Sequence, residues 1–274
     1  MDKKRKLLMT LLVVLAVFIV NRYTGEIFNG IKNTYVAEFL SEFKCAAVAF
    51  LGAVILKKTW IYRRFDTALL KKSWTTGLFE VFFTLFSLFI FFTVYGQRIT
   101  VTAKPTEILL FLLMMFCIGI YEETLFRGLL QNGFHEFFGE DTVGHVILAV
   151  VCAGLCFGAL HLTNALRPGV SLSNAAIQAL SACGGGIFYG AIYFRTGKNL
   201  WYNMLIHGFH DALAFLMQGG LSGADSSAVI SGSSQGSGIL GVIIQFVLYG
   251  GVGLFLLRKK KVEPLLKKTE AEAI

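Results

Sequence analysis

Eight long apolar runs divide this chain, and they constrain its fold more than any other feature of the sequence. A helix needs roughly 20 mostly apolar residues to cross about 30 Å of hydrocarbon. Hydrophobic residues make up 55% of the 274 positions and charged residues only 15%. The runs cover residues 7–20, 43–56, 78–95, 106–121, 143–162, 175–194, 200–217 and 238–257. The sequence therefore predicts an all-α, polytopic membrane bundle of about eight transmembrane helices, the first two of which are short.

Basic residues are distributed unevenly between the two sides of such a bundle. Lys and Arg collect in cytoplasmic loops, so the richer side is expected to face the cytoplasm. One side carries Lys3, Lys4, Arg5, Lys6, Lys57, Lys58, Arg63, Arg64, Lys71, Lys72, Arg127, Arg195, Lys198, Arg258, Lys259, Lys260, Lys261, Lys267 and Lys268. The other side carries only Arg22, Lys32, Lys44, Arg98, Lys104 and Arg167. This contrast predicts cytoplasmic N- and C-termini. The net charge of +8 is then explained by membrane topology and by contact with acidic lipid, so a nucleic-acid partner is not needed.

The polar stretches between the runs are too short to form a soluble core. The longest are the basic loop at 57–72, the Ser/Gly-rich segment at 222–238 and the charged tail. The initial "MDKKRK" is expected to precede a retained span, because the "NRYTGE" that follows the first run offers no small-x-small cleavage site. The sequence therefore predicts a single integral membrane domain over residues 1–274.

Two adjacent carboxylates and an arginine stand at the end of the fourth run, in "GIYEETLFRGLL". An ionised carboxylate in the bilayer costs about 2.5 to 3.5 kcal/mol on insertion scales, so two of them persist only beside a cavity or a partner. Glu123 and Arg127 are four residues apart and can pair on one helical face. Glu122 then has no predicted partner in this motif. A simple helix end at the interface is the alternative reading of this pair of glutamates.

Two further runs also carry ionisable groups. "FGALHL" places His161 near the end of the fifth run, and "LIHGFHDAL" places His207, His210 and Asp211 inside the seventh. A lone intramembrane histidine is often a satisfied interhelical hydrogen bond, but ionisable groups on three spans indicate a functional site. His207 and Asp211 share a helical face, so Asp211 could orient one imidazole nitrogen while the other points to a cavity. His210, one turn from His207, could take the same role instead.

At these residues the sequence resembles a known family. "EETLFR" matches E-E-x-x-x-R, "FGALH" matches F-x-x-x-H, and "HGFHD" matches H-x-x-x-N/D, in this order and within residues 106–215. The ordered trio is similar to the CPBP family of intramembrane proteases, which includes type II CAAX prenyl endopeptidases and bacterial proteins of bacteriocin processing and self-immunity. The resemblance implies an endopeptidase of the bacterial cell membrane that cleaves a peptide or a lipidated or membrane-associated protein. Asp211 departs from the family's commoner asparagine.

The residues available suit the chemistry that the resemblance implies. Peptide hydrolysis needs an activated water, a base and a group that stabilises the oxyanion. Glu122 is predicted to be the base, with Glu123 and Arg127 fixing the local field and Asp211 orienting His207. His161 and His207 either hold the water directly or, with Glu122, bind a divalent metal such as Zn²⁺. The sequence has no H-E-x-x-H motif, so the metal rests on residue types and family precedent.

One geometric tension accompanies this assignment. Glu122 would lie near the cytoplasmic end of the fourth span, whereas His161 would lie near the opposite face. Either the fourth helix continues through "FRGLLQNGFHEFF" as one long tilted rod, or the fifth begins below the membrane plane. We expect the first, because this segment is helical in pattern and lacks proline. The inner placement of Glu122 predicts substrate access from the cytoplasm or inner leaflet. It also predicts that His135 and His145, in the cytoplasmic connection, are dispensable.

Two other classes of protein compete with a protease. A non-catalytic immunity or assembly protein of the same fold would carry the same spans, although an intact trio of motifs argues against decay. A transporter would also place ionisable groups on several spans, but the halves show no inverted repeat and the polar residues cluster in the second half.

Overall fold

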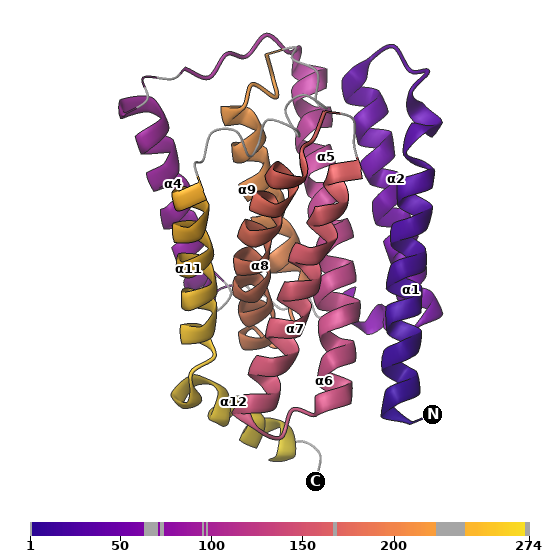
Figure 1. Ribbon diagram of the computed structural model, residues 1–274, viewed down its shortest axis with the longest axis vertical. Coiled ribbons are helices and arrows are strands. Elements are labelled where there is room, and N and C mark those ends of the chain that lie inside the picture. The colour runs from indigo at the N-terminus through magenta and orange to yellow at the C-terminus, as the bar shows by residue number, and fades with distance from the viewer. Residues whose placement is uncertain are drawn as a thin grey trace.

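The computed structural model describes residues 2–62, 71, 74–94, 96, 98–166, 169–222 and 239–271, and it is a bundle of helices lying side by side (Figure 1). The helices are α1 (Lys3–Tyr23), α2 (Thr34–Ile55), α4 (Leu78–Thr93), α5 (Pro105–Glu123), α6 (Asn132–Phe138), α7 (Val143–His161), α8 (Leu172–Arg195), α9 (Leu200–Met217), α11 (Ile239–Leu256) and α12 (Lys259–Ala271). Short 3₁₀ turns are η1 (Gly25–Phe28), η2 (Thr59–Tyr62) and η4 (Leu162–Leu166), and η3 (Thr124–Gln131) is a π-helix. Within the described ranges there is no β-strand.

The outer faces of these helices are apolar, as a lipid-facing surface requires. Five helices are long and apolar enough to cross a membrane: Lys3–Tyr23, Pro105–Phe138, Val143–Leu166, Leu172–Arg195 and Ile239–Leu256. Large exposed side chains on the outer helices include Leu12 and Leu15 of α1 and Phe82 and Phe89 of α4. Soluble proteins rarely expose such contiguous apolar surface. The predicted all-α membrane bundle is confirmed, while the number of spans and the side of the termini stay predictions.

The expected continuation of the fourth helix is confirmed. Pro105 occupies the first turn of α5, where its missing N–H costs nothing, and the helix then runs without a break through η3 to Phe138. The π-helical stretch begins directly after Glu123. Such stretches are rare in proteins, and those that occur often lie at functional sites. Glu122 therefore lies in the middle of a 34-residue helix instead of at the end of a span, which corrects the depth assigned to it from the sequence.

Helix α8 lies at the centre of the bundle, between α7, α9 and α11 (Figure 1). It approaches α7 closely through glycines: a Cβ added to Gly186 would lie 2.7 Å from the Gly154 Cα, closer than real Cβ atoms come. Gly154 and Gly158 form one G-x-x-x-G pattern, and Gly186 and Gly190 form another. The small residues of such patterns let neighbouring helix backbones approach closely. The long helix also lies close to α8 at a glycine, because a Cβ added to Gly190 would lie 2.7 Å from Gln131 Oε1.

A second close approach joins α5 to α9. A Cβ on Gly119 would lie 2.5 Å from the Met204 carbonyl oxygen, and one on Gly208 would lie 2.9 Å from the Met115 carbonyl oxygen. Gly119 is one turn from Glu123, and Gly208 follows His207. The glycine contact therefore brings the motif carboxylates and the motif histidine of α9 to one level of the bundle.

Helix α2 begins earlier than the second apolar run. The run starts at residue 43, but the helix starts at Thr34, capped by Asn33, whose side chain accepts a hydrogen bond from the Val36 N–H. Ser41 and Glu42 lie in this added first half, and their polarity hid it from a hydropathy pattern. Both side chains line an internal cavity, which gives these polar residues a place in the bundle.

The two ends of the bundle differ in charge. The N-terminus and α12 lie at the same end (Figure 1). This basic end carries the described residues Lys3, Lys4, Arg5, Lys6, Lys57, Lys58, Lys71, Arg195, Lys198, Arg258, Lys259, Lys260 and Lys261. Two of these lysines bridge helix ends: Lys58 Nζ is 2.7 Å from Glu136 Oε1, and Lys198 Nζ is 2.5 Å from Glu140 Oε1. Arg63, Arg64, Lys72 and Arg167 of the charge comparison lie outside the described residues.

Candidate active site

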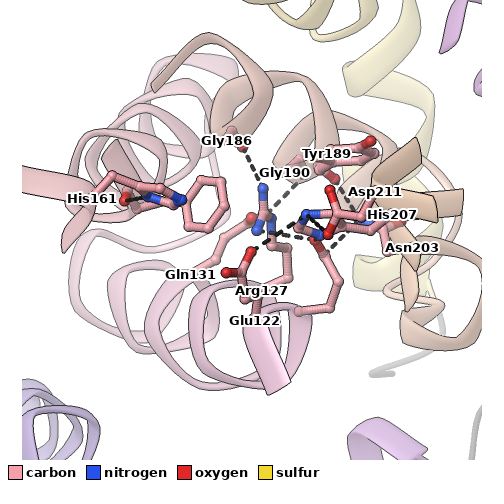
Figure 2. A network of polar contacts seen from close by, with 12 residues as sticks. Glu122, Arg127, Gln131, His161, Gly186, Tyr189, Gly190, Asn203, His207 and Asp211 are labelled. Atoms are coloured by element: carbon pink, nitrogen blue, oxygen red, sulfur yellow. Dashed lines mark hydrogen bonds and ion pairs between the residues drawn. The ribbon is translucent and has the colours of Figure 1, made fainter. Parts of the chain in front are cut away.

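Glu123 is the buried anchor of a polar network between α5, α8 and α9. Figure 2 labels its partners Arg127, Asn203 and His207. Its side chain has no solvent exposure, and its Oε1 atom lies 3.0 Å from Arg127 Nη1 and 2.8 Å from His207 Nδ1. Asn203 Nδ2 donates to Glu123 Oε2 at 3.1 Å and to the Tyr189 carbonyl at 2.8 Å. The predicted Glu123–Arg127 pair is present, and the surrounding donors compensate for the loss of water around this buried carboxylate.

Glu122 faces the other side of the same histidine. Its Oε2 atom lies 3.4 Å from His207 Nε2, and its side chain keeps 20% exposure, whereas Glu123 has none. Asp211 Oδ2 is 3.7 Å from the same nitrogen. Glu123 therefore orients His207 through Nδ1, and Asp211, which the sequence suggested for that task, stands beside Nε2 with Glu122.

His161 reaches the site from the end of α7, opposite His207 (Figure 2). Its Nδ1 atom lies 2.9 Å from the Phe157 carbonyl oxygen, an acceptor, so Nδ1 carries the proton and Nε2 keeps its lone pair. The Phe157 ring contacts both imidazoles edge-on, with centroids 4.8 Å from His161 and 6.1 Å from His207. The same ring receives the Arg127 guanidinium at 4.7 Å, a cation–π distance.

An internal cavity of about 500 Å³ joins these groups, a volume suited to part of a peptide. Its lining includes Glu122, His161, His207 and Asp211 of the predicted site. Glu123 and Arg127 do not line it and support the wall from behind. The structure thus brings the six predicted residues to one region, where four of them line the cavity and the other two lie behind its wall.

Sequence reasoning missed several neighbours of the site. Tyr189 stacks on His207 at 5.0 Å between ring centroids and lines the cavity, and its buried hydroxyl group has no hydrogen-bond partner among the described residues. Asn203 fixes Glu123 from one turn before His207. The sequence signal for Asn203 was its i, i+4 spacing to His207, which shares the face that carries Asp211.

A second buried carboxylate and imidazole pair adjoins the first. Glu80 of α4 has no exposure, and its Oε1 atom lies 2.5 Å from His210 Nδ1. Thr84 Oγ1 donates to the same carboxylate at 3.4 Å. His210 also lines the cavity, so the ambiguity between the two histidines is reduced: His207 meets the motif glutamates, and His210 meets a helix that carries no motif.

Below Arg127 the long helix continues its polar face toward the basic end. Arg127 Nη2 donates to the Gly186 carbonyl at 3.5 Å, and Gln131 Nε2 donates to the Gly190 carbonyl at 3.0 Å (Figure 2). His135 follows one turn later, 2% exposed and 3.4 Å from Gln131 Nε2. The expectation that His135 lies in a connecting loop is therefore wrong, because this residue belongs to the buried face of α6, while its dispensability for cleavage stays a prediction.

The fit of a divalent metal can be assessed from the donor groups. His161 and His207 both have Nδ1 beside an oxygen acceptor and Nε2 available, the arrangement that metal-binding histidines use. Glu122 supplies a carboxylate beside His207 Nε2. Across the residues that the structure describes, however, no three His, Cys, Asp or Glu side chains are grouped as a metal site. The donor chemistry fits, and the grouping would require His161 to approach the other two.

Comparison with known families agrees with this geometry. The family described as type II CAAX prenyl endopeptidase, Rce1-like, matches residues 104–213. This stretch begins just before α5 and ends within α9, so it contains every motif residue described above. No curated protein and no solved structure gave a match. Over these residues the chain is similar to the Rce1-like type II CAAX prenyl endopeptidase family of intramembrane proteases, and its apolar helices identify it as an integral membrane protein.

Proposed function

We propose that this protein cleaves a peptide or a membrane-associated protein with a water molecule activated by Glu122. The observation that carries the proposal is the position of the Glu122 carboxylate, which lines the cavity and lies 3.4 Å from His207 Nε2. Glu123, one residue away, is buried and already bonded to three donors. Of the two glutamates, Glu122 is the one that a water and a substrate can reach.

Each step of hydrolysis has a residue in this arrangement. Glu122 takes the proton of the water as the oxygen attacks the peptide carbonyl, and it returns that proton to the leaving amine. Glu123 holds the Nδ1 proton of His207, so Nε2 stays directed at the cavity. The Tyr189 hydroxyl, buried at the cavity wall without a partner among the described residues, is a donor for the carbonyl oxygen as it becomes negative.

A divalent metal ion is the finer part of the proposal. Glu122, His161 and His207 would hold it, and a bound ion would lower the pKa of its water toward neutrality. The residues that bind and orient the water are the same with or without the ion. Metal content of the purified protein and the effect of chelators on cleavage therefore distinguish the two forms of the mechanism.

The test compares Glu122→Gln with Glu123→Gln in purified protein, with a pool of short synthetic peptides read by mass spectrometry. Glu122→Gln is expected to lower the cleavage rate by at least about a hundredfold with an unchanged melting temperature, because it removes the base and buries nothing new. Glu123→Gln is expected to lower both the rate and the melting temperature, because Arg127 loses its buried partner.

The result that reverses the assignment is full cleavage by Glu122→Gln together with a stable but inactive Glu123→Gln. Retained cleavage in a His161→Ala, His207→Ala double variant would remove the whole site from the reaction. A folded wild-type protein that cleaves nothing under any metal condition would favour a non-catalytic immunity or assembly protein of the same fold. His145→Ala, at an exposed position of the basic end, is the matched control and is expected to behave as wild type.

A further inference from the structure

The cavity is confined to one half of the bundle. Its lining residues on α1, α2 and α7 come from the last turns of α1 and α7 and the first half of α2. On α8 and α11 the lining descends from the first turns to Tyr189 and Tyr249, and on α9 it rises from His207 to Gln218. All of these segments point to the end of the bundle away from the N-terminus and α12 (Figure 1). The cavity therefore opens at the end opposite the basic one.

The other half of the bundle is solid beneath the site. All eight residues of η3, from Thr124 to Gln131, are buried. Arg127 and Gln131 extend onto backbone carbonyls of α8, and Asn132 Nδ2 donates to the Tyr193 hydroxyl at 2.9 Å. A substrate at the basic end would thus meet packed side chains before it could reach Glu122.

Side chains near the opening are suited to a peptide backbone. Amides and hydroxyls recur along the wall: Asn21, Asn164, Gln178, Ser181, Gln218 and Gln245. Each amide side chain offers both a donor and an acceptor, as each peptide unit of an extended chain does. Arg22 and Glu42, which carry opposite charges, also line the cavity.

We propose that the substrate is an extended peptide segment presented on the extracytoplasmic side of the membrane, and that it reaches Glu122 from that side. The proposal combines the opening opposite the basic end with the tendency of Lys and Arg to remain cytoplasmic. It rests on the proposed protease function for the nature of the ligand. It replaces the cytoplasmic access expected from the sequence, which depended on placing Glu122 at the end of a span.

The test uses the full chain in intact cells and a membrane-impermeant maleimide. Ser41→Cys introduces a thiol of similar size into the cavity wall near its opening, and Lys4→Cys introduces one at the exposed basic end. Wild-type protein, with its own five cysteines, gives the background. Ser41→Cys is expected to react at least about tenfold faster than Lys4→Cys in intact cells, and permeabilisation is expected to expose Lys4→Cys.

The opposite pattern, with Lys4→Cys labelled from outside and Ser41→Cys only after permeabilisation, would overturn the proposal. A second measurement uses activity: protein labelled from outside is purified and given the synthetic peptide pool. Labelled Ser41→Cys is expected to lose most of the cleavage it had before labelling, whereas Lys4→Cys labelled after permeabilisation keeps its own. Unblocked cleavage in fully labelled Ser41→Cys would show that substrates use another route.

The two proposals can fail separately. The labelling pattern needs no turnover, so it locates the opening even if no peptide is cleaved. Absence of cleavage in purified wild-type protein would defeat the protease function and leave the side of the opening decided by labelling alone.

Discussion

Phe157 has no ionisable group, yet it contacts three residues that do. Its ring meets the two motif imidazoles edge-on and lies under the Arg127 guanidinium, and its carbonyl accepts the His161 Nδ1 proton. The phenylalanine of F-x-x-x-H therefore spaces the two histidines and covers the buried ion pair. An apolar residue of a motif can thus position the polar side chains around it.

His135 supplies a prediction at the same scale. Its imidazole is buried against Gln131 and lies 5.4 Å from the Phe194 ring centroid, at the far side of η3 from the cavity. His135→Ala is expected to lower the free energy of unfolding by about 1 to 3 kcal/mol, because it leaves a cavity and removes one polar partner of Gln131. Thermal unfolding in detergent measures this loss, and cleavage per folded molecule is expected to stay within about twofold of wild type.

The exposed His145→Ala variant is the control for that experiment and is expected to leave the melting temperature unchanged. Equal melting temperatures for both variants would contradict the buried role of His135. A folded His135→Ala protein without cleavage activity would instead connect this residue to the reaction.

At the scale of elements, the approach of α5 to α9 determines whether the site exists at all. The glycines at this crossing leave no room for a side chain: a Cβ at position 119 would lie 2.5 Å from the Met204 carbonyl oxygen. The 2.8 Å contact between Glu123 and His207 lies one turn away on each helix. Separation of the two backbones by even a fraction of an ångström lengthens that hydrogen bond.

Gly119→Ala is therefore expected to reduce cleavage at least about tenfold while the chain still folds, because a misplaced His207 weakens catalysis more than it weakens the bundle. Initial rates and circular dichroism check the two parts of the statement. Gly251→Ala on α11 is the matched control, since nothing lies within 4 Å of its added Cβ. Comparable activity in both alanine variants would show that the crossing tolerates a side chain and does not position the site.

Much of the site followed from local sequence, and the rest depended on packing between distant helices. The Glu123–Arg127 pair was predictable because residues four apart share a helical face. Glu80, Asn203 and Tyr189 were not, because each acquires its role only through a neighbour on another helix. Hydropathy located the apolar runs but shortened α2 and ended the fourth run at residue 121, since it reads a polar cavity wall as the end of a span.

At the scale of the whole molecule, orientation follows from the unequal charge of the two ends. The N-terminus and α12 share the basic end, so both termini are expected in the cytoplasm. A fluorescent protein fused to either terminus is expected to fluoresce, and alkaline phosphatase at the same positions is expected to be inactive. Active phosphatase at both termini would reverse the orientation, and activity at one terminus alone would mean an odd number of crossings.

The buried π-helical stretch has a consequence for the membrane itself. A cavity that ends at mid-bundle leaves only the half of the protein near the basic end to separate the two sides of the membrane, and η3 with its contacts to α8 fills that half. Arg127, Gln131 and His135 are polar enough to conduct ions if they were hydrated, but their side chains are fixed on backbone carbonyls, on Glu123 or on one another. If the proposed peptide and its water occupy the cavity, these packed side chains are expected to keep the basic end of the bundle sealed from them.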